Sequence, residues 1–412
     1  SRMALHKKIG GTLLKGLATV AGIQLATAII VNTIATAHRR HRTPQGFPYR
    51  EPTTCQVDHN AVTIYTYGAH LYDAMIEAID AAEDHVYLES FIWKSDEVGQ
   101  RFLDAVARAS ARGVRVACVW DVFANLVVPR SFFRFPSTVM TAPFGLVRGG
   151  LAWLLPRNSG RDHRKILVVD GAVCFVGGYN LGSLYANKWR DTHVRVEGPF
   201  ALELEASFVD MWHVSDRHHR PLPYPRHRTW TSKLRLHRNV PRLAVYPIRG
   251  VYLDAINKAS ARIWLTHAYL LPDADLVQAL IDAAGRGVDV SIIIPAASNH
   301  PLTDWLSRAH YDTLLSGGVK LFLYEGAMIH SKTATIDSIW STVGTTNLDR
   351  VSMLGNYEVN VEFMDEAMAR TLEDTFRTDL TNCHELTLDE WRRRPQYAQV
   401  AEAILKPLRP LL

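Results

Sequence analysis

Apolar residues along this chain follow two spacings, one typical of helices and one typical of strands. Residues 71–82 have helical spacing and lead into the strand-like run 85–93. A second helical pattern over 99–111 ends before Gly113, and a strand pattern follows over 114–120. Alternating helices and strands are typical of an α/β fold.

The second half of the chain repeats this order. The spacing predicts, in turn, a helix over 252–260, a strand over 263–270, a helix over 276–284 and a strand over 288–294. The phrases Ala111-Arg-Gly-Val-Arg-Val and Gly285-Arg-Gly-Val-Asp-Val occupy equivalent places in the two series. Internal repetition therefore organises the chain, and we expect α/β layers in both halves.

Composition divides the chain further. We expect a membrane-associated helix and basic connector in 1–60, a first α/β domain in 61–212, a basic linker in 213–245, a second domain in 246–385 and a C-terminal tail in 386–412. At 412 residues the chain is long enough for two domains that each have a full core.

The N-terminal segment Gly16 to Ala37 holds 22 residues without a charge, enough to span a bilayer as a helix. Basic residues stand on both sides of it, so the positive-inside rule gives no orientation: Lys7, Lys8, Lys15, Arg39, Arg40 and Arg42. We favour an uncleaved anchor or an interfacial helix. A cleaved signal peptide and a buried core helix are the alternatives.

The net charge of +5 is mild, but its distribution is uneven. Residues 122–161 and 217–242 contain no Asp or Glu and suit an anionic partner, whereas the second stretch also fits a solvated basic linker. The first stretch mixes apolar and basic side chains: Phe132, Phe133, Phe135, Phe144, Trp153, Leu154 and Leu155 with Arg130, Arg134, Arg148 and Arg157. This mixture suits a bilayer interface. The alternatives are aromatics packed under the domain, or a grip on single-stranded nucleic acid, which the apolar N-terminus disfavours.

The chemistry lies in a pattern that occurs twice. The motif His-x-Lys-x-x-x-x-Asp comprises His163, Lys165 and Asp170 in the first half, and His330, Lys332 and Asp337 in the second. An Asn follows each His after 17 positions and a carboxylate after 28 positions: Asn180 and Asp191 in the first half, Asn347 and Glu358 in the second. Two such sets at matched offsets predict a symmetric site for a phosphate.

Strand geometry separates the roles within the motif. His163 and Lys165 are two apart, so on a strand their side chains share one face. Asp170 precedes Gly171, which is a hairpin signal, and 172–176 would be the returning strand. By the repeat, Asp337 has the same turn role.

These side chains can cleave a phosphodiester. Each Lys would neutralise non-bridging oxygens and each Asn would donate a hydrogen bond as charge builds. One His would attack phosphorus while the other protonates the leaving oxygen and later activates the acceptor hydroxyl. Asp191 and Glu358 would receive a ring N–H and fix the tautomer. This scheme needs no cofactor and no metal, and symmetry alone does not decide which His attacks.

The doubled motif resembles that of the phospholipase D superfamily and, within it, bacterial cardiolipin synthases. The segments that carry this resemblance are 162–171, 176–180, 189–193, 330–333, 343–349 and 356–358. It implies two similar α/β/α domains related by a pseudo-twofold axis, with one active site between them. It also implies that His163 is the nucleophile and His330 the acid and base.

For function, the resemblance implies transfer of a phosphatidyl group between two phosphatidylglycerol molecules, giving cardiolipin and glycerol. We expect a bacterial cell-membrane protein with its site at the cytoplasmic face and no nucleic acid partner; a homodimer is left open. The chain has one candidate span, whereas related synthases carry two. The alternatives are a hydrolytic phospholipase D that uses water, a membrane-tethered nuclease and a non-catalytic lipid-binding protein.

Overall fold

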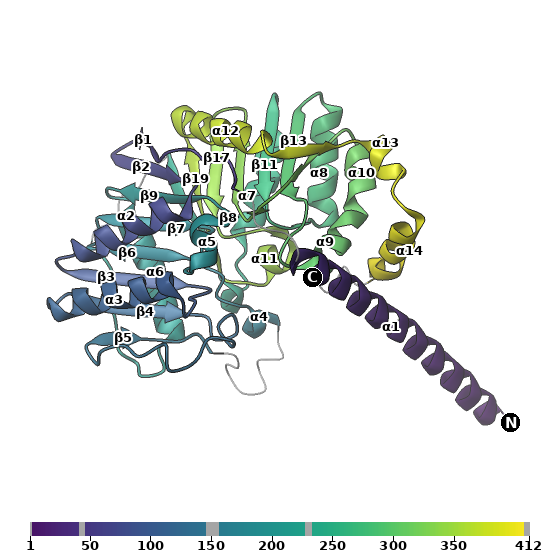
Figure 1. Cartoon of the computed structure of the whole chain (residues 1–412), viewed down its shortest axis with the longest axis horizontal. Coiled ribbons are helices and arrows are strands. Elements are labelled where there is room, and N and C mark those ends of the chain that lie inside the picture. Colours follow the sequence, from purple (N-terminus) through teal and green to yellow (C-terminus); the bar gives the residue numbers. More distant parts are fainter. Residues whose placement is uncertain (1, 41–45, 146–155, 227–232, 408–412) are drawn as a thin grey trace.

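The computed structural model describes residues 2–40, 46–145, 156–226 and 233–407, and two mixed sheets of eight strands form its centre (Figure 1). The first sheet has the order β1-β2-β9-β7-β6-β3-β4-β5. Its strands are β1 (Thr53–Val57), β2 (Asn60–Tyr65), β3 (His85–Ser90), β4 (Arg115–Trp120), β5 (Val139–Thr141), β6 (Ile166–Val169), β7 (Val173–Gly177) and β9 (His193–Glu197).

The second sheet repeats this topology in the order β10-β19-β17-β16-β11-β13-β14-β20. Its strands are β10 (Leu234–Asn239), β11 (Arg262–His267), β13 (Asp289–Pro295), β14 (Lys320–Tyr324), β16 (Lys332–Ile336), β17 (Trp340–Gly344), β19 (Glu358–Met364) and β20 (Cys383–Leu386). The two orders match strand for strand from β2 and β10 to β5 and β14, and in each sheet the last three matched strands are parallel. Two similar α/β halves are therefore confirmed.

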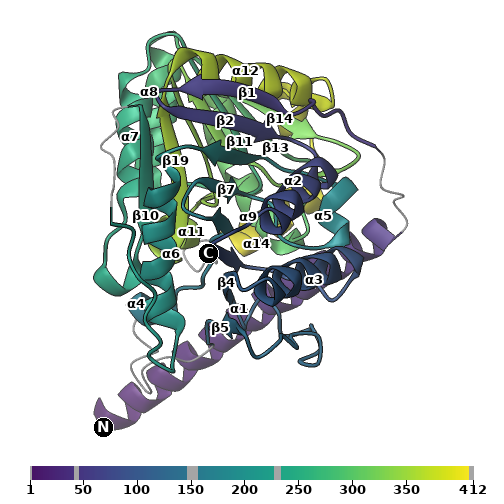
Figure 2. The same ribbon diagram turned by 90° about the vertical axis from the view of Figure 1, so that its left-hand side faces the viewer.

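Helices cover both faces of each sheet (Figure 2). On the first sheet, α2 (Gly68–Asp80) and α3 (Glu97–Ala111) share one core with its strands, and α6 (Ala201–Ser215) packs on the other face. On the second, α7 (Pro247–Lys258), α8 (Ala274–Gly285) and α10 (Tyr311–Ser316) pack on one face and α12 (Glu366–Leu380) on the other. The four helices and four strands expected from apolar spacing are all present. α7 begins earlier than expected because Pro247 is favoured at a first helical position.

The repeated Arg-Gly phrase has the same structural role in both halves. Gly113 and Gly287 follow α3 and α8 with φ of 89° and 87°, a left-handed conformation that favours glycine. The preceding Arg112 donates to the carbonyl oxygens of Ile79 and Ala82 at the end of α2. Arg286 does the same at the end of α7. The two phrases thus fix neighbouring helices to each other.

The two halves share one hydrophobic core. Val176 and Val194 of the first sheet belong to the same buried cluster as Val343, Val359 and Val361 of the second. Strands β7 and β9 therefore lie against β17 and β19, and these are the strands that flank the motifs. A site built from both motifs has to lie at this interface.

Several elements fall outside the segments in which the sequence predicts domains. β1 lies before residue 61, and β10 lies in the stretch 213–245 that was expected to be a linker. The expected tail contains α13 (Leu388–Arg392) and α14 (Gln396–Leu405). Part of the linker, 227–232, is outside the described residues. β10 pairs with β19 at the edge of the second sheet, so this stretch is part of that sheet as well as a connection.

The N-terminal helix α1 (Arg2–Arg40) projects from the globular part (Figure 1). Within the described residues, one helix is long and apolar enough to cross a membrane, and it is this one, over Gly16–Ala37 with 6% of it buried. A buried core helix is thereby excluded. Ala28 packs beside α9 (Pro301–Ser307) and α14 with Leu306 and Leu405, while Ile30 on the outward face stays 57% exposed.

Candidate active site

The histidines of both motif copies line one cavity at the interface of the halves. The cavity has a volume of about 240 Å³, and its walls include His163 and Asn180 from the first half and His330 and Asn347 from the second. Both histidines and both lysines are buried. The structure therefore brings the two motif histidines together, although they are 167 positions apart in the sequence.

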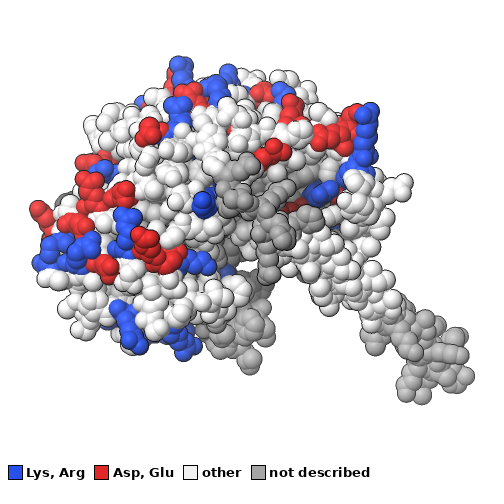
Figure 3. Space-filling model, viewed as in Figure 1, with Lys and Arg blue, Asp and Glu red and all other residues white. Residues whose placement is uncertain are grey.

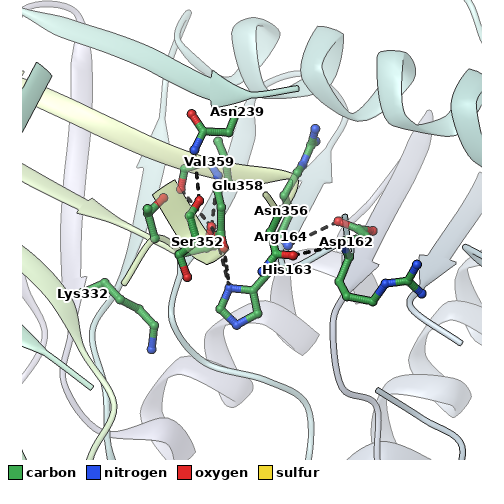
Figure 4. A network of polar contacts seen from close by, with 12 residues as sticks. Asp162, His163, Arg164, Asn239, Lys332, Ser352, Asn356, Glu358 and Val359 are labelled. Carbon is green, nitrogen blue, oxygen red and sulfur yellow. Dashed lines mark hydrogen bonds and ion pairs between the residues drawn. The ribbon is translucent and has the colours of Figure 1, made fainter. Parts of the chain in front are cut away.

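Each motif histidine pairs with the carboxylate of the other half. His163 Nδ1 lies 3.0 and 3.1 Å from the two carboxylate oxygens of Glu358 (Figure 4), and His330 Nδ1 lies 2.7 Å from Asp191 Oδ2. An ionised carboxylate only accepts, so when both carboxylates are charged each Nδ1 carries the proton and Nε2 keeps its lone pair. Each carboxylate lies where it can fix the tautomer, and each contacts the histidine of the opposite half, which the sequence did not show.

Backbone contacts across the interface place each histidine beside the carboxylate of the other half. The residue before each histidine forms a bridge to the residue before the other half's carboxylate: Asp162 pairs with Tyr357, and Ile329 pairs with Arg190. The backbone N–H of His163 donates to the Tyr357 carbonyl (3.1 Å), and that of His330 donates to the Arg190 carbonyl (2.7 Å). The second bridge joins the short strands β8 (Trp189–Arg190) and β15 (Met328–Ile329). The two histidines are thus held by equivalent backbone bonds.

The expectation that each His and Lys share a strand is partly wrong. β6 begins at Ile166 and β16 at Lys332, so both histidines lie just before their strands. The chain leaves the ladder there because its N–H groups bond across the interface instead. Each lysine still folds back over its own histidine. Lys165 Nζ donates to the His163 carbonyl at 2.5 Å, and Lys332 Nζ donates to the His330 carbonyl in the same way.

Burial and like charge control the protonation of these groups. Burial lowers the pKa of Lys165 to about 8 and that of Lys332 to about 7. Burial and then the neighbouring lysine charges hold the pKa values of both motif histidines well below the usual 6.5. Burial also raises the pKa of Glu358 to about 8, against the charge of Lys165. Neutral imidazoles beside ammonium groups suit nucleophilic attack on an anion.

The two asparagines lie in the cavity wall. Asn180 Oδ1 accepts from the Ile92 backbone N–H at 3.2 Å, which directs the amide nitrogen elsewhere. Asn347 is buried beside the second motif, and both of them line the cavity. Their amide groups are placed to donate to a phosphate oxygen.

The two motif aspartates are turn residues, as predicted. Asp170 and Gly171 have φ of 54° and 62°, typical of the central residues of a tight hairpin turn, and the Ala172 N–H closes the turn by donating to the Val169 carbonyl at 3.0 Å. The Asp170 carboxylate accepts from the backbone N–H groups of Glu83, Asp84 and His85. Asp337 binds the N–H groups of residues 260–262 in the same way. Each aspartate therefore ties the motif hairpin to the start of the neighbouring strand.

Several contributing residues could not be found from the repeat, because they occur in one half alone. Thr345 donates its hydroxyl to Glu358. The buried pair of Arg190 and Asp379 joins β8 to α12, with two N–O distances of 2.8 Å. Aromatic rings flank the two imidazoles: Phe91 at 4.7 Å from His163, and Trp189 and Tyr269 at 5.2 and 6.3 Å from His330.

The aromatic-basic stretch 122–161 is only partly described. Phe133 and Phe135 pack against Trp93 and Trp120, and Phe144 is fully buried. The alternative of aromatics packed under the domain therefore holds for these three. Four of the residues named for this stretch lie outside the described residues: Arg148, Trp153, Leu154 and Leu155. Among the described side chains of the stretch, the most exposed apolar ones are Phe123, Leu126 and Val127.

Among the described residues, no group of three or more His, Cys, Asp or Glu side chains could hold a metal ion. The cavity is lined instead by two asparagines and two carboxylate-bound histidines, and a buried lysine contacts the backbone of each histidine. Such a set can bind and polarise a phosphodiester, donate a proton to one of its oxygens and attack its phosphorus.

Comparison with known proteins places this site in a family. Residues 75–212 and 252–380 match the model of the family described as "Cardiolipin synthase, PLD-like domain". Cardiolipin synthases of Clostridium perfringens SM101 and Listeria monocytogenes EGD-e are 30% and 32% identical to this chain over 369 residues. These alignments cover 86% of this chain and 77% and 76% of the relatives.

The fold has a solved counterpart. The crystal structure of phosphatidylserine synthase from Haemophilus influenzae Rd KW20 superposes with a TM-score of 0.67 at 14% identity. The match covers 92% of this chain and 97% of that one. The fold and the paired site define a phospholipase D-like phosphatidyltransferase. The chain belongs to the cardiolipin synthase family with phospholipase D-like domains.

Proposed function

We propose that this protein makes cardiolipin by transferring a phosphatidyl group from one phosphatidylglycerol to another, with release of glycerol. One observation carries the proposal: two histidines, each bonded to the opposite half's carboxylate, line one cavity beside two buried lysines. Figure 4 shows Lys332 extending toward the side of the site where the His163 ring lies. The names of the curated relatives support the same activity.

In the first half-reaction, His163 Nε2 attacks phosphorus and the bond to the glycerol oxygen breaks. His330 donates a proton to that oxygen, so glycerol leaves as a neutral alcohol. Lys165 and Lys332 balance the charge on the non-bridging oxygens. The bound phosphate anion also offsets the lysine charges that lower the pKa of His330, and so helps His330 to carry the proton.

In the second half-reaction, His330 removes a proton from a glycerol hydroxyl of the second phosphatidylglycerol. This oxygen attacks phosphorus, the bond to His163 breaks and cardiolipin forms. Glu358 stabilises His163 through both steps because it accepts the Nδ1 proton. Asp191 does the same for His330.

Incubation of the purified protein with phosphatidylglycerol vesicles tests the activity by mass analysis of the products. Cardiolipin and glycerol in equal amounts are expected, and phosphatidic acid as the main product would identify the hydrolytic alternative. The variants His163→Ala and His330→Ala should each lose turnover. His384→Ala is the matched control, because His384 pairs with Glu390 on the surface.

The roles of the two histidines need a separate test. A donor labelled in its phosphatidyl group should leave a covalent adduct on His163, found by peptide mass analysis after rapid denaturation. The variant His330→Ala lacks the base for the second step. With a donor whose leaving group needs no proton, we therefore expect this variant to accumulate more of the His163 adduct. An adduct on His330 instead of His163 would reverse the two roles.

We further propose that α1 holds the protein at the bilayer. The described side chains of α1 form an uncharged surface beside a charged globular part (Figure 3), and Leu25, Ile30 and Ile34 are more than half exposed. Leu271 lines the active-site cavity and also packs in the small apolar cluster with Ala28 of α1. This contact supports a cavity close to the membrane surface. A cytoplasmic site and an absence of nucleic acid partners stay predictions.

A further inference from the structure

The active-site cavity is asymmetric although the motifs that form it are symmetric. The wall from the first half includes the apolar and aromatic side chains of Phe91, Ile92 and Trp189. The wall from the second half adds polar groups that the mechanism above does not use: Asn299, His300, Thr303 and Asp349. We call these four residues the polar end of the cavity.

The polar end lies on the side of His330. The Tyr269 ring is 6.3 Å from the His330 ring and 5.6 Å from the His300 ring. The Tyr269 hydroxyl donates to Asn299 Oδ1 at 2.6 Å, which fixes the Asn299 side chain. Because its oxygen is the acceptor in this bond, the amide nitrogen of Asn299 is the group left to donate to a ligand.

Asp349 supplies the complementary acceptor. It ends the short strand β18 (Leu348–Asp349) and caps α11 (Arg350–Leu354), where its two oxygens accept from the backbone N–H and the hydroxyl of Ser352. A carboxylate has about four acceptor positions, so lone pairs remain for a ligand. Two residues after the first-half asparagine, the equivalent position is Gly182, which has no side chain. The acceptor therefore comes from the second half alone.

We propose that the polar end of the cavity is a binding site for the glycerol group of phosphatidylglycerol. A carboxylate, an amide donor and a threonine hydroxyl match the vicinal hydroxyls of a neutral polyol. A second phosphate fits less well, because Asp349 would repel it. The cavity of about 240 Å³ has room for roughly eight waters of liquid volume, more than one phosphate group needs.

One glycerol site serves both half-reactions. The group that protonates the leaving oxygen is the group that later deprotonates the attacking oxygen, so both oxygens occupy the same place beside His330. Leaving glycerol and acceptor glycerol would therefore bind the same polar end in turn. This inference rests on the proposed function, in which His330 is the acid and base.

The proposed site also predicts a preference for an alcohol over water as the acceptor. Of the four residues, Asp349 is buried and Thr303 is half-buried, whereas Asn299 and His300 are exposed. A glycerol whose other hydroxyls bind these residues has its attacking hydroxyl oriented beside His330. Water cannot fill all of these contacts from the attacking position. The polar end is therefore the feature that separates a transferase from a lipase.

The test uses a donor without glycerol, phosphatidyl-p-nitrophenol, whose leaving group needs neither a proton nor the polar end. With free glycerol as acceptor, the product ratio of phosphatidylglycerol to phosphatidic acid reports transfer against hydrolysis at any total rate. Three variants are compared with the natural protein: Asn299→Ala, Thr303→Val and Asp349→Asn. Asparagine is also a good helix cap, so Asp349→Asn retains α11.

We expect each variant to need about tenfold more glycerol for half-maximal transfer, with a lower transfer-to-hydrolysis ratio at low glycerol. Saturating glycerol should restore part of this ratio. Thr313→Val is the matched control because Thr313 is an exposed residue of α10, and its ratio should equal that of the natural protein.

A ratio and a glycerol requirement within twofold of the natural protein in all three variants would overturn the glycerol site. If the natural protein itself transfers nothing to glycerol and gives only phosphatidic acid, the proposed synthase function fails instead. The two failures are therefore distinguishable in the same assay.

Discussion

At the scale of single residues, the site depends on which carboxylate holds which histidine. The sequence predicted that Asp191 and Glu358 fix the imidazoles, because both occur at the same offset from a motif histidine. It did not show that Glu358 binds His163 and Asp191 binds His330, since that depends on how the halves face each other. Repeated residues were therefore predictable and their partners were not.

Loss of either carboxylate should lower the rate and leave the fold intact. We expect Glu358→Gln and Asp191→Asn each to reduce kcat at least about a hundredfold, because an amide no longer selects the Nδ1–H tautomer. Turnover of phosphatidylglycerol by the purified variants measures this. Glu366→Gln is the control, because Glu366 is exposed at the start of α12. If kcat of both site variants stayed within tenfold of the natural value, the assigned roles of Glu358 and Asp191 would be wrong.

The lowered pKa values of the two lysines predict that the activity of the free enzyme decreases at alkaline pH. Burial lowers the pKa of Lys332 to about 7 and that of Lys165 to about 8, so their charges are present below these values and are lost as the pH rises through them. We expect kcat/KM to fall above about pH 7, where the uncharged site binds a phosphodiester weakly. kcat should fall at higher pH, because bound phosphate stabilises the ammonium groups. If kcat/KM and kcat fell over the same pH range, this role of the lysines would be wrong.

At the scale of elements, the two motif aspartates anchor the hairpins that follow the catalytic segments. Their role was predictable because Asp170 precedes a glycine and Asp337 repeats its offset. Less predictable was β10, which lies in a basic stretch rich in proline and histidine. Its basic residues suit an edge strand, where charge discourages pairing with other chains. Composition alone therefore indicated a linker.

Removing one hairpin anchor should cost stability. Asp170→Ala leaves the backbone N–H groups of Glu83, Asp84 and His85 without their acceptor, and we expect unfolding to become easier by about 1–3 kcal/mol. Asp337→Ala should cost a similar amount because its contacts are equivalent. Denaturant unfolding measures both changes. A change under about 0.5 kcal/mol would show that solvent replaces the carboxylate.

At the scale of the whole molecule, the apolar segment 16–37 was readable from the sequence and coincides with the candidate span. Its docking was not readable, because α9 and α14 are hundreds of residues away. Ala28 and Val31 face the globular part, and Ile29, Ile30 and Ile34 face outward with more than half of each side chain exposed. An apolar outward face beside the domain suits contact with lipid.

Deleting residues 1–42 should release the protein from membranes, measured by flotation with phosphatidylglycerol vesicles. Because this deletion also uncovers Leu306 and Leu405, a second variant replaces Ile29, Ile30 and Ile34 by asparagine and keeps the docked face. We expect neither variant to float with the vesicles. If both stay bound, the exposed side chains of Phe123, Leu126 and Val127 become the membrane contact.

The exchange of carboxylates has a consequence for how such a chain could arise. A half with one motif would hold its histidine without the bonded carboxylate, since Glu358 and Asp191 each serve the opposite half. An ancestor of half this length would complete its site only as a twofold dimer that exchanged the same contacts. Duplication and fusion would then have joined two interdependent copies, and freed one copy to gain the polar residues that the other lacks.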